Sequence, residues 1–127
     1  MTVLAKTATG KPPELAVSCR GVGKSFGRGQ ASVKALRGVD IDLHTGQLIM
    51  LVGPSGCGKT TLLSVISGVL DADEGDAAIF GVPWKSLGRD AKTKRRGELV
   101  GFVFQQFNLL APLTAAENVA VPLLIRG

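Results

Sequence analysis

The residue types best suited to chemistry lie together in one stretch, GPSGCGKTT, at residues 53–61. It carries a glycine, four spacers, a second glycine, a lysine and a threonine, which is the pattern of a phosphate-binding loop. A triphosphate presents closely spaced anionic oxygens, so its binding site must direct several main-chain N–H groups toward one point without side chains in the way. The motif predicts such a site at Gly53, Pro54, Ser55, Gly56, Cys57, Gly58, Lys59, Thr60 and Thr61.

The glycines of this loop are expected to shape its backbone. Gly53, Gly56 and Gly58 can take the positive φ angles that curl a chain around phosphate oxygens. The helix predicted to begin near Lys59 adds the positive end of its dipole, which is equivalent to roughly half a charge. Loop and helix together predict a concave, positively polarised site.

Four side chains of the loop have separate expected roles. Lys59 supplies a full positive charge for the β- and γ-phosphates, and the Thr60 hydroxyl is placed to ligate Mg²⁺. Thr61 is expected to lie near the α-phosphate. Cys57 is one of the spacers, and we expect a bulky maleimide on its thiol to block nucleotide entry sterically.

The segments on either side of the loop predict a strand and a helix. LIMLV, at residues 48–52, is apolar at every position, which predicts a strand buried on both faces, as in a parallel sheet covered by helices. After the loop, apolar residues recur at helical spacing: they are Leu62, Val65, Ile66 and Val69. Strand, loop and helix in this order are the context that the motif requires.

Weaker patterns predict further strands before and after this unit. ELAVSC at 14–19 and DAAIF at 76–80 are short strand candidates, and the segment 20–30 is rich in turn residues. VDIDL at 39–43 alternates, which predicts a half-exposed antiparallel strand. Its apolar side chains face one side and its acidic ones face water: Val39, Ile41 and Leu43, and Asp40 and Asp42.

The last forty residues contain two predicted helices and a predicted strand. The polar segment 86–96 predicts a weak helix, and LVGFVF at 99–104 predicts a second buried strand. TAAE at 114–117 has the spacing of a capping box, so a helix is expected to open there and to run through Val119. Pro122 is expected to end or bend that helix.

The composition is that of an ordinary globular domain, with 127 residues, 45% of them hydrophobic and 20% charged. No apolar run approaches the roughly 20 residues of a membrane-spanning helix. The net charge of +5 includes a basic cluster, at Lys92, Lys94, Arg95 and Arg96. We interpret this cluster as a solvated helix end and expect no nucleic-acid partner, since we find no nucleic-acid-binding motif.

The start of the chain, MTVLAKTATGKPP, lacks the charged segment and apolar core of a secretory signal. Its glycine and prolines predict a flexible tail at 1–13, followed by one domain at 14–127. A disulfide between Cys19 and Cys57 would freeze the loop. We therefore expect both cysteines to be reduced, which indicates a cytosolic compartment.

Three segments invite comparison with known families: VGKSFG, ALRGVDIDLHTGQLIMLVGPSGCGKTTLLSVISGV and GFVFQQFNLLAPLTAAENVAVPL. In this order they resemble the aromatic A-loop, Walker A and Q-loop regions of the ATPases of ATP-binding cassette (ABC) transporters, most closely the lipoprotein-releasing and macrolide-exporter subgroup. The likeness runs from about residue 15 to residue 127. It implies an α/β P-loop NTPase fold: an ABC-type ATPase core with an N-terminal antiparallel β subdomain, whose C-terminal part is missing.

The resemblance assigns roles to two residues outside the loop. Phe26 would stack on the adenine ring, where the family more often has tyrosine; the alternative is a loop aromatic that covers apolar surface. Gln105 would be the Q-loop glutamine, which in the family helps to bind Mg²⁺ and the attacking water and senses the membrane partner. Gln106 takes this place if the register slips by one residue. Gln105 is thus the expected catalytic residue and, with Thr60, an expected metal ligand.

The function implied by the resemblance is ATP binding and hydrolysis coupled to export or extraction of a substrate through a membrane permease. The expected cofactors are ATP and Mg²⁺. The expected partners are a permease and a second ATPase subunit. The expected location is the cytoplasmic face of the membrane, as a peripheral protein.

Several motifs of the family are not found before Gly127: the signature motif, the Walker B aspartate, the catalytic glutamate and the switch histidine. Since phosphoryl transfer depends on every charge around the γ-phosphate, this chain alone is expected to bind nucleotide without hydrolysing it. Two other classes remain open from the sequence. One is a non-hydrolysing regulatory module that docks a permease, and the other is a nucleic-acid binder that rests on charge alone.

Overall fold

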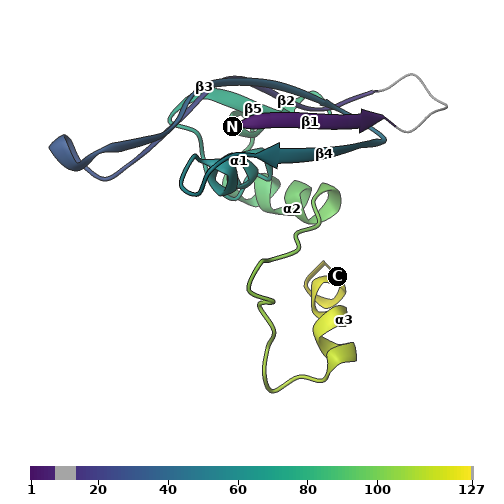
Figure 1. Cartoon of the computed structure of the whole chain (residues 1–127). Coiled ribbons are helices and arrows are strands. Elements are labelled where there is room, and N and C mark those ends of the chain that lie inside the picture. Colours follow the sequence, from purple (N-terminus) through teal and green to yellow (C-terminus); the bar gives the residue numbers. More distant parts are fainter. Residues whose placement is uncertain (8–13, 127) are drawn as a thin grey trace.

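The computed structural model describes residues 1–7 and 14–126. In chain order the elements are β1 (Thr2–Thr7), β2 (Leu15–Phe26), η1 (Gly29–Ala31), β3 (Val33–His44), β4 (Gln47–Val52), α1 (Lys59–Ile66), β5 (Glu74–Ile79), β6 (Val82–Pro83), η2 (Trp84–Ser86), α2 (Arg89–Leu99) and α3 (Ala115–Arg126). The strands form a layer over α1 and α2, and α3 hangs below α2 at the end of an extended segment (Figure 1). The architecture is mixed α/β, as predicted.

Two antiparallel sheets make up the β layer. The larger has the strand order β3-β2-β5-β6, and the smaller pairs β1 with β4. β2 and β3 form a long hairpin whose tip, with η1, projects to one side in Figure 1. The alternation predicted within β3 is confirmed, since its apolar side chains are half-buried and its acidic ones exposed: Val39, Ile41 and Leu43, and Asp40 and Asp42. The predicted antiparallel β subdomain is present.

β2 is longer than the sequence predicted, because it continues through the glycine-rich segment that we expected to be a turn. Its pairing with β3 shifts register between Cys19 and Val22 and again near Lys24, as β-bulges do. Gly21, at the first shift, has a φ of 59°. The glycines here therefore permit β-bulges within a strand. A turn would have a similar composition, which is why the sequence did not distinguish the two.

The first residues of the chain form a strand, so the predicted flexible tail is wrong for residues 2–7. β1 pairs with β4 at every position, from Thr2 opposite Val52 to Thr7 opposite Gln47. The reason is that β4 offers a row of main-chain donors and acceptors that an extended segment can satisfy. Residues 8–13 of the predicted tail lie outside the described residues.

β4 is not buried on both faces, so that prediction is also wrong. Its side chains alternate: Leu48, Met50 and Val52 are 73%, 59% and 44% exposed, whereas Ile49 and Leu51 are half-buried. Its pairing with β1 is antiparallel, not parallel. Within the described chain a layer covers only one face of β4, and the apolar residues of the other face lie at the surface.

The second predicted buried strand, at 99–104, is wrong as well. α2 extends to Leu99, and the residues after it pair with no strand in the described structure. Phe102, Val103 and Phe104 are 43%, 97% and 51% exposed. Lacking a neighbouring strand, the two phenylalanine rings contact each other, with centroids 5.1 Å apart.

The capping box at the start of α3 is confirmed. The Thr114 hydroxyl donates to Glu117 Oε2 at 2.8 Å, and the Glu117 N–H donates back to Thr114 Oγ1 at 3.3 Å. The hydrogen bond from the Thr114 N–H to the Glu117 carboxylate, followed by that from the Thr114 hydroxyl, holds the pKa of Glu117 below its usual value. Pro122 lies inside α3, which continues to Arg126, so of the two expected effects the end of the helix is wrong and a bend stays a prediction.

A small core joins the larger sheet to α1 and to Trp84. It consists of Cys19, Val22, Leu36, Leu62, Val65, Ala77, Ile79 and Trp84. The Trp84 indole N–H donates to the carbonyl of Ile66 at 2.8 Å, and a Cβ on Gly68 would lie 2.7 Å from its ring. Arg96 of α2 donates to the Gly68 carbonyl at 3.0 Å. The end of α1 is therefore held by two side chains from outside the helix.

Replacing Trp84 with phenylalanine tests this anchor. Trp84→Phe keeps an aromatic ring but leaves the part-buried Ile66 carbonyl without its donor, which should lower the free energy of unfolding by about 1–3 kcal/mol. Denaturant unfolding measures the change, and Phe107→Leu, at a side chain 83% exposed, is the control. Equal stability of the two variants would show that the anchor contributes nothing.

Candidate functional site

The predicted phosphate loop connects the end of β4 to the start of α1. Gly56 and Gly58 have φ angles of 78° and 94°, so the left-handed conformations predicted for them are confirmed. Gly53 does not have a positive φ, and that prediction is wrong. Glycine is needed at this position for a different reason: a Cβ there would lie 2.6 Å from Cys57 Sγ. The loop thus uses two glycines for their backbone angles and one for close packing.

Gly58 is also in close contact with β3. A Cβ at this position would lie 2.6 Å from the carbonyl oxygen of Ala35 and 3.1 Å from Cδ2 of Leu36, which is buried. Strand β3 therefore lies directly against the residue at which α1 begins. Only glycine permits this approach, and it fixes the direction in which the helix leaves the loop.

The first turn of α1 has main-chain donors available for a ligand. The first bond of the helix runs from the Leu62 N–H to the Gly58 carbonyl, at 2.8 Å. The N–H groups of the preceding residues, Lys59, Thr60 and Thr61, have no acceptor within the helix. In the described structure Gly58 provides no side-chain cap and the first turn holds no acidic residue. These donors and the helix dipole favour an anion at this end.

The ammonium group of Lys59 stays at the loop. Its Nζ donates to the carbonyls of Gly53 and Pro54, at 2.7 and 2.8 Å, and lies 3.6 Å from Cys57 Sγ. A positive charge is thus placed beside the curled backbone by the loop itself. Cys57 is a free thiol, and so is Cys19, which fits the expectation of reduced cysteines.

Thr60 and Thr61 differ in their surroundings. Thr60 is exposed, and its carbonyl accepts a hydrogen bond from the Ser64 hydroxyl at 2.9 Å. Thr61 is half-buried. Mg²⁺ is commonly held by one or two protein oxygens together with substrate phosphates. Among the described residues there is no cluster of three histidine, cysteine or acidic side chains that could hold a metal. An exposed hydroxyl beside a phosphate site fits a metal bound mainly by its nucleotide.

Phe26 ends β2 at the tip side of the long hairpin. It pairs with Val33, which lies two residues before Ala35, the residue in contact with Gly58. Its ring is 46% exposed, and the ammonium of Lys24 lies 5.9 Å from the ring centroid. The structure therefore places an exposed aromatic ring on the strand pair that contacts the loop.

Asp73 fixes the strand segment before Phe26. Its carboxylate accepts hydrogen bonds from the Lys24 ammonium and from the Ser25 N–H, both at 2.8 Å. The hydrogen bond from Lys24, followed by that from Ser25, holds the pKa of Asp73 below its usual value. Sequence reasoning missed this residue, because nothing in the chain's pattern shows that positions 24 and 73 meet.

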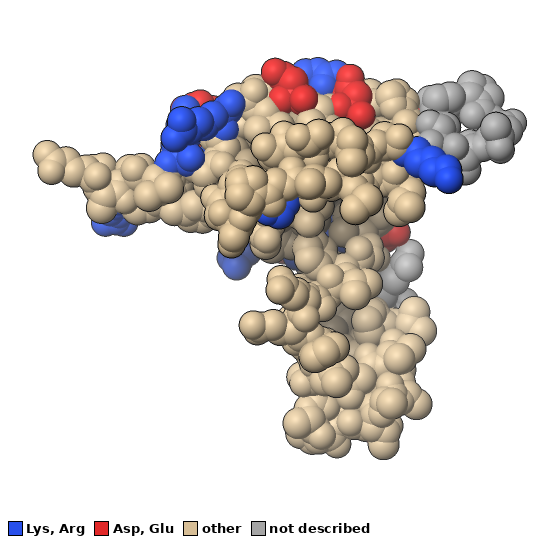
Figure 2. All heavy atoms as spheres, in the orientation of Figure 1, with Lys and Arg blue, Asp and Glu red and all other residues tan. Residues whose placement is uncertain are grey.

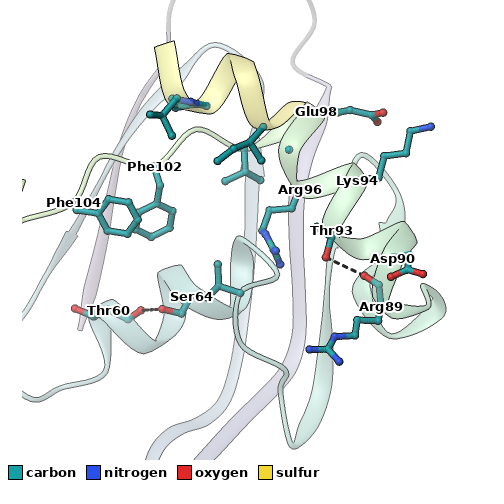
Figure 3. A pocket seen from close by; sticks show the side chains of 16 residues that line it. Thr60, Ser64, Arg89, Asp90, Thr93, Lys94, Arg96, Glu98, Phe102 and Phe104 are labelled. Carbon is teal, nitrogen blue, oxygen red and sulfur yellow. Dashed lines mark hydrogen bonds between the residues drawn. The ribbon is translucent and has the colours of Figure 1, made fainter. Parts of the chain in front are cut away.

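Gln105 and Gln106 lie on an exposed turn between α2 and α3. Neither forms a hydrogen bond to the phosphate loop within the described chain. A groove of about 1240 Å³ lies between α1 and the segment before the turn (Figure 3). It is lined by Thr60 and Ser64 of α1 and by Phe102 and Phe104 of that segment. The structure thus brings the glutamine segment toward α1 without placing a glutamine at the loop.

Asn118 of α3 organises the segment that follows these glutamines. Its Oδ1 accepts from the Leu110 N–H at 2.8 Å, and its Nδ2 donates to the carbonyls of Leu110, Leu113 and Thr114 at 3.0–3.2 Å. Sequence reasoning missed this role. The feature of the sequence that could have indicated this role is an asparagine one turn into a capped helix, directly after an irregular segment.

The basic residues visible on one face of the molecule are divided into separate groups (Figure 2). On the face shown in Figure 2, the blue side chains lie in small groups over the strands, some beside acidic ones, and the lower part of the molecule is almost uncharged. Lys92 pairs with Asp71 at 2.5 Å, and Arg96 donates to a main-chain carbonyl. Lys92 and Arg96 thus have partners within the chain, and the interpretation of the cluster as a solvated helix end stays a prediction.

The fold and the loop together define a P-loop nucleotide-binding domain, and comparison with known proteins identifies its family. The protein family described as "ABC transporter" matches residues 36–125. The chain therefore belongs to the ABC transporter family, as an ATP-binding domain, and the resemblance noted from its motifs is confirmed.

The most similar relatives include ATP-binding proteins of two bacteria. The chain is 40% identical over 116 residues to the uncharacterized ABC transporter ATP-binding protein YbbA of Escherichia coli K12, covering 91% of this chain and 51% of YbbA. It is 42% identical over 109 residues to the lipoprotein-releasing system ATP-binding protein LolD of Pseudomonas fluorescens, covering 86% of this chain and 48% of LolD. The chain thus spans about half the length of these relatives.

Solved structures show the same fold. The dimeric structure of MJ0796, an ABC transporter cassette, matches with a TM-score of 0.72 and 32% identity over 87% of this chain and 48% of that one. A dimeric post-hydrolysis state of MJ0796 bound to ADP and Pi matches with a TM-score of 0.71 and 33% identity, over the same shares of both chains. The predicted fold class is confirmed. In the described part of this chain, no helix is both long and apolar enough to cross a membrane.

Two alanine substitutions in the loop separate backbone strain from close packing. Gly56 and Gly58 both have positive φ, but a Cβ on Gly56 would meet nothing within 4 Å, whereas one on Gly58 would meet β3. Gly56→Ala should lower the unfolding free energy by about 1–2 kcal/mol, the cost of a left-handed L-residue. Gly58→Ala should cost at least about 1 kcal/mol more, because the contact with Ala35 must open. Chemical denaturation measures both, and equal costs would contradict the packing at Gly58.

Proposed function

We propose that this chain is the ATP-binding part of an ABC transporter ATPase, in which ATP binding and hydrolysis drive movement of a substrate through a membrane permease. The observation that carries the proposal is the loop at residues 53–61. Its two left-handed glycines, its lysine held at the curled backbone and the open first turn of α1 form an anion site. Membership of the family gives that anion its identity as the phosphate chain of ATP.

In the proposed complex the loop binds the phosphates through main-chain N–H groups of Gly56 to Thr61. Lys59 would exchange its bonds to the Gly53 and Pro54 carbonyls, in part or entirely, for β- and γ-phosphate oxygens. Thr60 would ligate Mg²⁺, which neutralises phosphate charge when bound. The remaining loop residues, Pro54, Ser55 and Cys57, would line the entry to the site.

Two residues outside the loop complete the proposed site. Phe26 would stack on adenine, which its exposed ring and its place on the strand pair beside Gly58 support. Gln105 would help to position Mg²⁺ and the attacking water. Its exposed turn must then move toward the loop when nucleotide binds. The groove between α1 and the segment that carries Gln105 gives room for that approach.

The proposed partners are a permease and a second ATPase subunit. α3 supports a partner surface, because its apolar side chains are 68–82% exposed at Val119, Leu123, Leu124 and Ile125. The relatives named above support the direction of transport and the dimer, since one belongs to a lipoprotein-releasing system and another forms a dimeric structure. We infer export or extraction of a substrate, with this domain at the cytoplasmic face of the membrane.

Hydrolysis is proposed as a property of the complete cassette and not of these 127 residues. In the described structure the loop and the first turn of α1 hold no acidic residue that would polarise water. A half-site of this kind binds nucleotide but loses most of its acceleration. The alternative function, a non-hydrolysing module that binds nucleotide or docks a permease, is favoured by the same observation.

Isothermal titration with Mg-ATP tests the proposal. The chain should bind ATP with one site, and Lys59→Ala should weaken binding by about 10- to 100-fold because a charge-assisted contact of about 1.5–3 kcal/mol is lost. Lys94→Ala, on exposed α2, is the matched control and should bind like the parent chain. Binding that does not change in Lys59→Ala but falls in Lys94→Ala would overturn the proposed site.

Phosphate release, measured on the same samples, separates the two forms of the proposal. Binding without turnover is expected for this chain by itself. Steady turnover by the pure chain, lost in Lys59→Ala, would show that the half-site argument is wrong while leaving the nucleotide site in place.

A further inference from the structure

Asp73 links the strand segment that carries Phe26 to the larger sheet, a contact that the proposed function does not use. Among the described residues, the pairing of β2 with β5 ends at Gly23, which lies opposite Glu74, the first residue of β5. Asp73 comes directly before Glu74, and its N–H donates to the Gly23 carbonyl at 2.9 Å. The main-chain contact between the two strands therefore stops three residues before Phe26.

The Asp73 side chain extends this contact beyond the paired strands. One carboxylate oxygen accepts from the Ser25 N–H and the other from the Lys24 ammonium, both at 2.8 Å. Ser25 comes directly before Phe26 in β2, so the first of these bonds fixes the backbone that leads to the ring. One carboxylate thus holds both residues that precede Phe26.

The end of β2 needs such a support, because its pairing with β3 is irregular there. Ser25 lies opposite Lys34 and Phe26 opposite Val33, but the register shifts between Lys24 and Ser25. The last buried residue of β2 is Gly23. Beyond it the hairpin projects from the molecule (Figure 1), and a two-stranded ribbon of this kind is marginally stable by itself.

The Lys24 ammonium lies over the Phe26 ring, 5.9 Å from its centroid, which is within the range of a cation–π interaction. Asp73 holds the ammonium there through an ion pair in which the Lys24 side chain is 14% exposed. Since the ammonium lies over one face of the ring, a flat ligand such as a purine must stack on the opposite face. Asp73 therefore helps to set both the position of the ring and the face that it offers.

We propose that Asp73 is a positioning residue for the base of the nucleotide: its carboxylate holds Ser25 and Lys24 so that the open face of the Phe26 ring receives the adenine of ATP. The inference rests on the proposed function, and within it on the stacking of adenine on Phe26. Asp73 acts through its two neighbours and contacts neither base nor phosphate. Its removal should therefore weaken binding of the base and leave binding of the phosphate chain unchanged.

Two ligands separate the base from the phosphates: Mg-ATP, and magnesium tripolyphosphate, which has three phosphates and no base. Titration calorimetry measures the Kd of each. Asp73→Ala should bind Mg-ATP about three- to tenfold more weakly than the parent chain, as expected if the ring is in place a third to a tenth of the time. It should bind tripolyphosphate like the parent.

Asp71→Ala is the matched control. It removes a carboxylate of the same charge two residues away, which pairs instead with Lys92 of α2. This variant should bind both ligands like the parent chain. Denaturant unfolding of each variant reports whether the fold is intact at the temperature of the titration.

Phe26→Ala completes a double-mutant cycle with Asp73→Ala. Phe26→Ala alone should weaken binding of Mg-ATP by about 5- to 150-fold, the loss typical of one aromatic partner of a base. In the Phe26→Ala background, Asp73→Ala should cause no further loss, because Asp73 acts through the ring. A merely structural role of Asp73 would give the same loss with and without the ring, and would contradict the inference.

The other outcomes are equally distinct. Unchanged Mg-ATP affinity in Asp73→Ala, or an equal loss for both ligands, would overturn the inference and leave the proposed function standing. Unchanged affinity in Phe26→Ala would overturn the inference together with the proposed role of Phe26, while the phosphate site would stand. Failure of the parent chain to bind either ligand would overturn the inference and the proposed function together.

Amide hydrogen exchange on the unmodified chain provides a second test that does not depend on a variant's folding. Coupling between two sites is reciprocal, so a base that stacks on Phe26 must stabilise the bond from the Ser25 N–H to Asp73. Saturating Mg-ATP should slow exchange at the Ser25 amide more than saturating magnesium tripolyphosphate does, while both ligands protect the loop. Equal exchange at Ser25 with the two ligands would contradict the coupling.

Discussion

The start of α1 presents main-chain N–H groups that have no acceptor within the helix, and in the described structure no side-chain hydrogen bond caps them. This constraint explains the glycines. Gly56 and Gly58 turn the backbone through angles that other residues avoid, and Gly53 makes room for Cys57. A ligand that fits must be small, anionic and rich in acceptors at this end, which describes a phosphate group.

A site made from main-chain groups is only as well defined as the elements that carry it. α1 is short, at eight residues, and is fixed at both ends by other parts of the chain. At its start Gly58 lies against β3. At its last residue the Ile66 carbonyl accepts from Trp84, and just beyond the helix the Gly68 carbonyl accepts from Arg96. The cationic Arg96 also lies at the negative end of the helix dipole, where it is stabilising.

The elements that hold α1 do not include the turn that carries Gln105 or the helix α3, which lie apart from the loop. Gln105 lies on an exposed turn, and Asn118 of α3 bonds to Leu110 in the segment that follows this turn. Few buried contacts join this part to the β layer, so it is the part whose position is most easily changed by a ligand or a partner.

Local patterns in the sequence predicted the parts that depend on local physics. The loop, the start of α1, the alternation in β3 and the capping box at Thr114 follow from residue spacing within a few positions. The loop at residues 53–61 was therefore predictable as a motif. The backbone angle at Gly53 was not, because glycine is needed there to avoid a clash with Cys57.

The errors concern pairing between distant segments. An apolar run such as LIMLV fits a strand with one or two covered faces equally well, and only the tertiary structure decides. β1 was missed because its alternation is weak and its partner residues lie 40 to 50 positions away, from Thr7 opposite Gln47 to Thr2 opposite Val52. Phe26 and Gln105 were assigned by resemblance, and their roles remain proposals.

Nuclear magnetic resonance of the ¹⁵N-labelled chain, titrated with Mg-ATP, addresses the anion site most directly because it observes each main-chain N–H separately. We predict that the largest shifts occur at the amides of Gly56, Gly58, Lys59 and Thr60, with little change in β5 and β6. Shifts confined to the basic helix α2, with the amides at the start of α1 unmoved, would show that ATP is attracted by surface charge alone and would contradict this account.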